Sequence, residues 1–146
     1  MNAGILIVED EGLIALALKS ELEQVGFTVV MIDDNATEAM LSVERLRPAL
    51  VLMDIRLRGD RDGIETADLI RRRFHVPVMF VTAYADRETI FRARITGPFD
   101  YIVKPFHGVD FRDRIDMALR EHKRTERQRL AIEQQRIRSE VVRPGP

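Results

Sequence analysis

Five polar side chains that could perform chemistry lie at the ends of short apolar runs in the sequence. They are Glu9, Asp10, Asp54, Thr82 and Lys104. Clustered carboxylates repel one another, and a divalent cation such as Mg²⁺ is their usual stabiliser, bound together with waters and a phosphate oxygen. A hydroxyl and a lysine suit the remaining oxygens of a phosphoryl group, and a carboxylate can itself be the nucleophile. If the fold brings these side chains together, the sequence predicts a phosphoryl site.

Short apolar runs and amphipathic segments alternate along the chain and would position these groups. The runs cover residues 5–8, 29–32, 50–53, 78–81 and 101–103. They do not alternate with polar residues, which is typical of strands buried on both faces of a parallel sheet. The segments between and after them have apolar residues at helical spacing: Ile14, Leu18, Leu22 and Val25; Ala36, Met40 and Val43; Ile64, Ala67 and Ile70; Phe111, Ile115 and Leu119. The remaining segment, residues 86–94, is the fourth of the five in chain order and is weakly patterned.

This strand–helix unit, repeated five times, predicts an α/β fold. We expect a (βα)5 doubly wound parallel sheet with helices on both faces. In such sheets, functional groups gather beyond the carboxyl ends of the strands. All five candidate side chains lie there, so the fold class and the site support each other.

Composition excludes several other classes of protein. The chain has 146 residues, enough for one ordinary domain, with 45% hydrophobic and 32% charged residues. It has no cysteine, so a disulfide framework, a thiolate zinc site and a cysteine nucleophile are excluded. The apolar runs are far shorter than a membrane span needs, and the first residues lack a signal-peptide pattern. We therefore expect a cytoplasmic protein with no membrane partner.

Four stretches resemble the receiver domain of two-component response regulators. They are Ile7-Val8-Glu9-Asp10-Glu11, Val51-Leu52-Met53-Asp54-Ile55, Val81-Thr82-Ala83 and Asp100-Tyr101-Ile102-Val103-Lys104-Pro105-Phe106. The resemblance covers residues 3–122 approximately, and the four motifs occur in the family's order. It implies a flavodoxin-like sheet with strand order 2-1-3-4-5.

The resemblance also implies a role for each candidate residue. Asp54 would accept a phosphoryl group from a histidine kinase or phosphotransfer protein. Glu9 and Asp10 would place Mg²⁺ (or Mn²⁺) together with Asp54, and the backbone carbonyl of Arg56 would supply a further ligand. The chain would be a switch without classical enzyme activity, apart from catalysing its own phosphorylation and dephosphorylation.

Three further positions match the part of the family motif that senses the phosphoryl group. Lys104 would pair with a phosphoryl oxygen, and its bond to Pro105 would be cis. Thr82 would hydrogen-bond the phosphoryl group on arrival, and Tyr101 would swing inward behind it. The switch would then change a surface that binds a downstream protein or a second copy of the chain.

The sequence departs from the family at two places and leaves simpler interpretations open. The acidic pair is Glu-Asp where Asp-Asp is usual, and Gly97-Pro98 stands where the family has Gly-Ala, which could alter the loop before the fifth strand. Asp54 could merely cap the following loop, and Asp10 could N-cap the first helix. A phosphatase with an aspartyl nucleophile would need a second aspartate at the position of Arg56, so that alternative is weak.

The last 27 residues differ in charge from the rest. Residues 120–146 carry eight Lys/Arg and four Glu, a net of +4, which leaves 15 basic and 20 acidic residues, a net of −5, before them. We expect a receiver domain over 1–122 and a basic helical tail or linker over 123–146. The helix should run to about Ser139, and the residues from Val141 onward should be disordered.

Several functions of the tail remain open from the sequence. Leu130 and Ile137 lie one heptad apart, but Glu133 and Gln134 lie between them, so the coiled-coil pattern is weak. The tail could pair two receivers, be a linker from a longer signalling protein, or be a basic arm for an acidic partner. It is too short for a DNA-binding output domain, and we expect the receiver to bind no nucleic acid. The alternative function is a phosphorylation-independent adaptor that acts through this helix.

Overall fold

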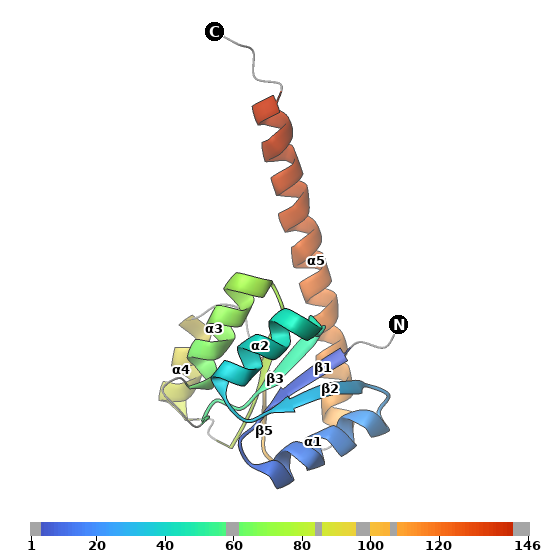
Figure 1. Ribbon diagram of the computed structural model, residues 1–146, viewed down its shortest axis with the longest axis vertical. Helices are drawn as coiled ribbons and strands as arrows, with labels where there is room; N and C mark the ends of the chain where they lie inside the picture. Colours follow the sequence, from blue (N-terminus) through green and yellow to red (C-terminus); the bar gives the residue numbers. More distant parts are fainter. Residues whose placement is uncertain (1–3, 58–61, 84–85, 96–99, 106–107, 142–146) are drawn as a thin grey trace.

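The computed structural model describes residues 4–57, 62–83, 86–95, 100–105 and 108–141. Their strands are β1 (Gly4–Val8), β2 (Thr28–Asp33), β3 (Leu50–Met53), β4 (Val78–Thr82) and β5 (Asp100–Val103). Their helices are α1 (Gly12–Gln24), α2 (Ala36–Leu46), α3 (Gly63–Phe74), α4 (Arg87–Ile95) and α5 (Gly108–Val141). The strands are parallel and follow the order β2-β1-β3-β4-β5 (Figure 1), which confirms the predicted fold.

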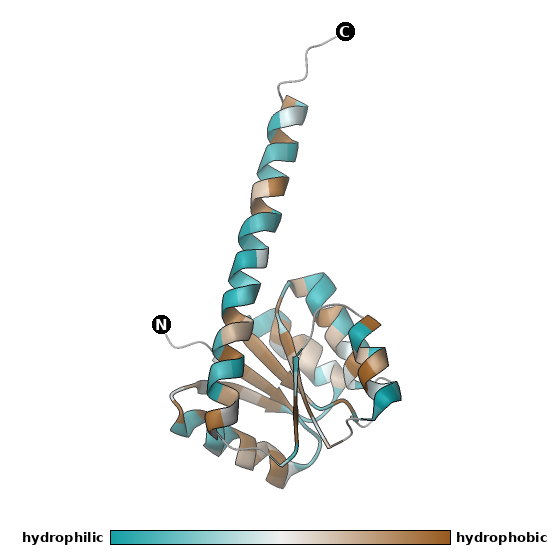
Figure 2. Ribbon diagram, turned by 180° about the vertical axis from the view of Figure 1, so that it is seen from behind, coloured by the Kyte–Doolittle hydropathy of each residue, from teal (hydrophilic) through white to brown (hydrophobic). Residues whose placement is uncertain are grey.

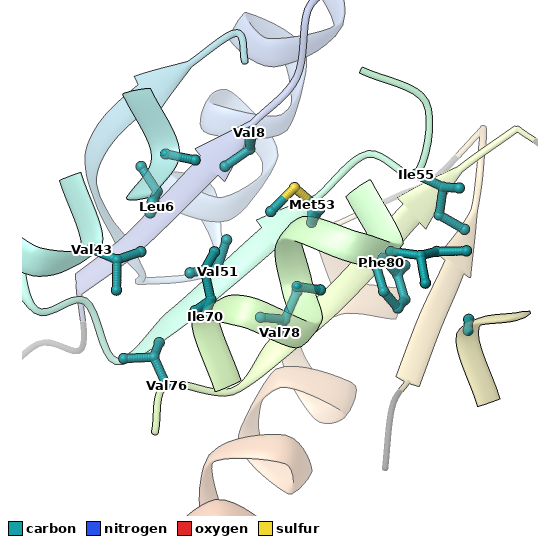
Figure 3. Packing of buried hydrophobic residues seen from close by; sticks show 14 residues of the cluster. Leu6, Val8, Val43, Val51, Met53, Ile55, Ile70, Val76, Val78 and Phe80 are labelled. Carbon is teal, nitrogen blue, oxygen red and sulfur yellow. The ribbon is translucent and has the colours of Figure 1, made fainter. Parts of the chain in front are cut away.

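Two buried clusters, one on each face of the sheet, form the core. On one face, strand residues such as Val51 and Phe80 pack against α2, α3 and α4 (Figure 3). On the other, the intervening strand residues, such as Leu52, pack against α1 and against Phe111 of α5. Successive residues of a strand point to opposite faces, so strands that are apolar throughout serve both clusters at once. This double burial explains the unbroken apolar runs of β1, β3 and β4.

The second run does not fit the expectation of burial on both faces. In β2 the burial alternates at the start of the strand, and the Val30 side chain is 40% exposed. The reason is the position of β2 at the edge of the sheet, where it pairs only with β1. The fifth run departs from the expectation for the same reason, because β5 lies at the other edge and its Val103 is 42% exposed.

The predicted helical faces agree with the structure in most positions. In α3, Ile64, Ala67 and Ile70 are all buried as expected. In α1, however, the buried residues include Ala15, and Val25 is the C-cap and not a core residue. The following Gly26 has a positive φ of 97°, the left-handed conformation that glycine adopts at helix ends.

Helix α5 is longer than predicted and projects beyond the body of the molecule (Figure 1). Its first turns are anchored by Phe111 and Ile115, both fully buried. It then continues to Val141, two residues past the predicted end and into the segment expected to be disordered. The predictions for residues 142–146 and for Gly97-Pro98 fall outside the described residues. Over the described part of the chain, none of the helices is long and apolar enough to cross a membrane.

Candidate functional site

Backbone hydrogen bonds extend the sheet one residue past the strands and fix the candidate side chains. The amide of Asp54 donates to the carbonyl of Val8 at 2.9 Å, and that of Lys104 donates to the carbonyl of Thr82 at 2.9 Å. The amide of Glu9 donates to the carbonyl of Asp33 at 2.9 Å. Because the strands are parallel, these residues lie along one edge of the sheet, as the sequence predicts.

Lys104 joins the two buried carboxylates of this edge. Its Nζ lies 3.2 Å from both carboxylate oxygens of Glu9 and 3.3 Å from Oδ2 of Asp54. The Lys104 side chain is only 14% exposed, and those of its two partners are less exposed still. The peptide bond between Lys104 and Pro105 is cis, as the family resemblance implies.

The charges at this edge are poorly balanced. Burial and the nearby Asp54 carboxylate raise the pKa of Glu9 to about 8, although Lys104 acts in the opposite direction. Burial lowers the pKa of Lys104, but the attraction of Asp54 and Glu9 outweighs it and the net pKa is raised. One ammonium group therefore does not offset the cost of burying two carboxylates, and a cation at this edge would be favoured.

The donors at this edge suit a hard divalent ion. Carboxylate oxygens of Glu9, Asp10 and Asp54 lie within 4.8 Å of one another, and Asp10 is partly exposed. Oxygen donors in this number, with room for water, fit Mg²⁺ or Mn²⁺. Asp10 is not a helix cap, because α1 begins at Gly12 with Glu11 as its N-cap.

Both carboxylate oxygens of Asp54 accept hydrogen bonds. Oδ2 faces Lys104, and Oδ1 accepts a hydrogen bond from the backbone amide of Arg56 at 3.1 Å. The second contact closes a local turn, so Asp54 does cap the loop that follows it, as the simpler interpretation predicts. It does not account for the buried lysine on the other oxygen.

Thr82 and Tyr101 lie on the neighbouring strands. Thr82 is fully buried at the end of β4, at the same edge as Lys104. Tyr101 pairs with Phe80 in the sheet and is partly buried against the cluster that α2, α3 and α4 cover.

Two residues of this edge were not identified from the sequence. Asp33 ends β2, is 9% exposed, and its Oδ2 has no hydrogen-bond partner among the described residues. Burial is the main cause that raises its pKa. The rule that examines each strand end would have found it, since Asp33 directly follows the second apolar run.

The other is Gly63, which packs against the backbone of the Asp54 loop. A Cβ there would lie 2.0 Å from the carbonyl oxygen of Asp54, and the Gly63 amide donates to the carbonyl of Ile55 at 2.6 Å. The sequence offers one signal, because Gly63 follows Asp62, whose side chain caps α3. Close backbone contact at that position is not visible in sequence.

Comparisons with known proteins agree with this fold and this edge. The family model described as "Response regulator receiver domain" matches residues 5–116. The transcriptional regulatory protein PdtaR of Mycobacterium tuberculosis is 36% identical over 115 residues, 79% of this chain and 56% of that protein. The signal receiver domain of a modulated diguanylate cyclase from Desulfovibrio desulfuricans is 38% identical, with a TM-score of 0.79, covering 84% of this chain and 98% of that one.

A third similar structure extends over nearly the whole chain. It is a fusion that contains a trimeric coiled-coil segment of yeast Spc42, with 28% identity and a TM-score of 0.79, and it covers 97% of this chain and 94% of its own. The fold and these comparisons define a receiver domain of two-component signalling. The chain belongs to the response regulator receiver family. It spans about half the length of the curated relatives it matches.

Proposed function

We propose that the chain accepts a phosphoryl group from a phosphohistidine onto Asp54. The observation that supports this most directly is the position of Lys104, buried between Asp54 and Glu9 at the carboxyl edge of the sheet. A lysine there can pair with an oxygen of a phosphoryl group bound to Asp54. The donor would be a histidine kinase or a phosphotransfer protein, in the cytoplasm.

In the proposed reaction a carboxylate oxygen of Asp54 attacks phosphorus. A P–O bond forms as the P–N bond to the donor histidine breaks, and the imidazole leaves with its electron pair. Glu9, Asp10, Asp54 and the backbone carbonyl of Arg56 would hold Mg²⁺ or Mn²⁺. When bound, the metal would neutralise charge on the phosphoryl oxygens. Thr82 would hydrogen-bond the phosphoryl group on Asp54, and the Tyr101 side chain would then swing inward.

The output would be protein binding by a surface that changes on phosphorylation. The long exposed helix α5 favours a second copy as one partner. The same helix also favours a second function, that of a phosphorylation-independent adaptor. A DNA-binding output is not part of the proposal for this chain.

Acetyl phosphate with Mg²⁺ provides the test. We expect a mass gain of one phosphoryl group that is lost in Asp54→Ala and after removal of the metal with EDTA. Asp113→Ala, which changes an exposed aspartate of α5, is the matched control and should be phosphorylated normally. A mass gain that persists in Asp54→Ala would contradict the proposal, and no gain in the natural chain would favour the adaptor.

A further inference from the structure

The outer part of α5 has an apolar stripe that nothing in the described chain covers. Leu130 is 50% exposed, Ile137 47% and Val141 77%. At 3.6 residues per turn, Leu130 and Ile137 lie on one line along the helix, with Val141 one turn beyond. The projecting part of the helix is mostly teal, with a few separate brown segments (Figure 2).

Charges of opposite sign flank this stripe. One flank carries glutamates at heptad spacing, namely Glu126, Glu133 and Glu140. The other flank carries Arg124 and Arg138. With Leu130 and Ile137 at heptad position d, the glutamates occupy g and Arg124 and Arg138 occupy e. The other choice, with Leu130 and Ile137 at a, would put all three glutamates into the core at d.

Within the described part of one chain, all three glutamates of the first flank form ion pairs, but not every arginine of the other flank does. Glu126 contacts Arg129 at 2.8 Å, and Arg136 lies between Glu133 and Glu140. These arginines lie on the far side of the glutamate flank. On the basic flank, Arg124 pairs with Glu121 at 2.6 Å, whereas Arg138 has no carboxylate partner among the described residues. Arg138 therefore remains available for a partner.

We propose that this partner is a second copy of the chain, and that two α5 helices form a parallel, in-register, two-stranded coiled coil from about residue 123 to Val141. In a parallel pair, position g of one helix faces the following position e of the other, so Glu133 meets Arg138 of the second copy. An antiparallel pair would bring the glutamate flanks together and the arginine flanks together. The opposite signs of the flanks therefore select the parallel arrangement.

The register also sets the strength of the pair. Two of the three a positions from residue 127 onward hold polar side chains, Arg127 and Gln134, and only Val141 is apolar. Polar residues at a specify alignment at a cost in stability. The dimer should therefore be weak and concentration-dependent. This proposal specifies the helix, the orientation and the register by which the homodimer suggested above would form. It does not depend on phosphorylation of Asp54.

Cysteine cross-linking tests the geometry, because the natural chain has no cysteine. In full-length Gln134→Cys, the two thiols would meet across the dimer axis, and we expect rapid disulfide formation when oxidised glutathione is added as the electron acceptor. In Ser139→Cys, on the outer face at position f, cross-linking should be at least about tenfold slower. Equal rates at the two positions would overturn the proposal.

Sedimentation of the full chain, without a phosphodonor, tests partner and orientation. We expect a monomer–dimer equilibrium that Ile137→Lys abolishes and Gln134→Leu strengthens by about tenfold or more. Glu133→Arg should weaken the dimer and Glu133→Arg/Arg138→Glu should restore it; a double variant that dimerises no more tightly than Glu133→Arg would overturn the parallel arrangement. A monomer at every concentration, or a trimer, would overturn the proposal.

Two controls separate this proposal from the proposed function. Circular dichroism of each variant verifies that the fold is intact, and acetyl phosphate labelling reports Asp54 independently of assembly. Asp54→Ala should dimerise through α5 as the natural chain does. Loss of dimerisation in Asp54→Ala would overturn the independence of the two sites.

Discussion

Lys104 is the residue whose removal should separate metal binding from phosphoryl transfer. Its ammonium contacts Glu9 and Asp54, so it can balance a phosphoryl oxygen but also competes with a metal for the carboxylates. We predict that Lys104→Ala lowers the rate of labelling by acetyl phosphate about 100-fold, the usual loss for one positioned electrostatic partner. Mg²⁺ affinity, measured by calorimetry, should be unchanged or higher.

The matched control for this substitution is Lys19→Ala. Lys19 makes an exposed pair with Glu23 at 3.9 Å on α1, and such pairs contribute little. Its loss should change neither labelling nor Mg²⁺ affinity. A labelling rate in Lys104→Ala close to that of the natural chain would show that Lys104 only balances the buried carboxylates.

His122 should make the stability of the protein depend on pH. Burial lowers its pKa below the ordinary value, and His75 and Arg129 act in the same direction, while Glu126 opposes them. At this residue the unfolded chain therefore binds more protons, so the contribution of His122 to stability is fully present above about pH 6.5 and is lost as the pH drops toward the lowered pKa of the folded state. We predict that the free energy of unfolding at about pH 5.5, minus that at about pH 7.5, is higher in His122→Gln than in the natural chain.

Denaturant unfolding of both proteins at the two pH values measures this difference. Comparing differences removes the titration of carboxyl groups common to both proteins. An equal loss of stability in His122→Gln would mean that His122 does not contribute. The sequence alone supports no such role, because the three histidines lack ligand spacing and burial is known only from the fold.

At the scale of secondary-structure elements, the approach of α3 to the Asp54 loop is the tightest constraint. A Cβ on Gly63 would collide with backbone atoms of Asp54 and Ile55, which cannot rotate away as a side chain can. We predict that Gly63→Ala lowers the free energy of unfolding by about 3 kcal/mol or more. It should also slow labelling of Asp54, because the loop must move.

Gly12→Ala is the control for this prediction, since Gly12 also begins a helix. A Cβ there meets nothing within 4 Å, so the substitution should change stability by less than about 0.5 kcal/mol. Thermal or denaturant unfolding compares the two variants. Similar stabilities for Gly63→Ala and Gly12→Ala would mean that α3 can shift away from the loop without cost.

The elements themselves were largely predictable, and the exceptions have physical causes. Apolar runs identified all five strands because most are covered on both faces, and the strand-end rule located Glu9, Asp54 and Lys104. The exposure of β2 was not predictable from its run, because it depends on which strand lies at the edge. Asp33 and Gly63 depend on burial and on backbone proximity, which arise only when distant segments meet.

At the scale of the whole molecule, the charge split corresponds to a division between a core and a projecting helix. The buried contacts of α5 come from Phe111 and Ile115, whereas Leu130 and Val141 beyond them are exposed. We predict that a chain ending at His122 keeps its fold. At low protein concentration, its free energy of unfolding should lie within about 1 kcal/mol of that of the full chain, because exposed helix pairs contribute little.

Protein concentration should then separate the two chains. If α5 pairs with a second copy, dimerisation stabilises the folded full chain by mass action, so its melting temperature rises with concentration. The chain ending at His122 lacks Leu130 and Ile137 and should melt at one temperature throughout. Calorimetric melts over a wide concentration range measure this. A truncated chain that does not fold would show that the outer helix belongs to the core. If the melting temperatures of both chains depend on concentration in the same way, any self-association must occur through residues before position 123.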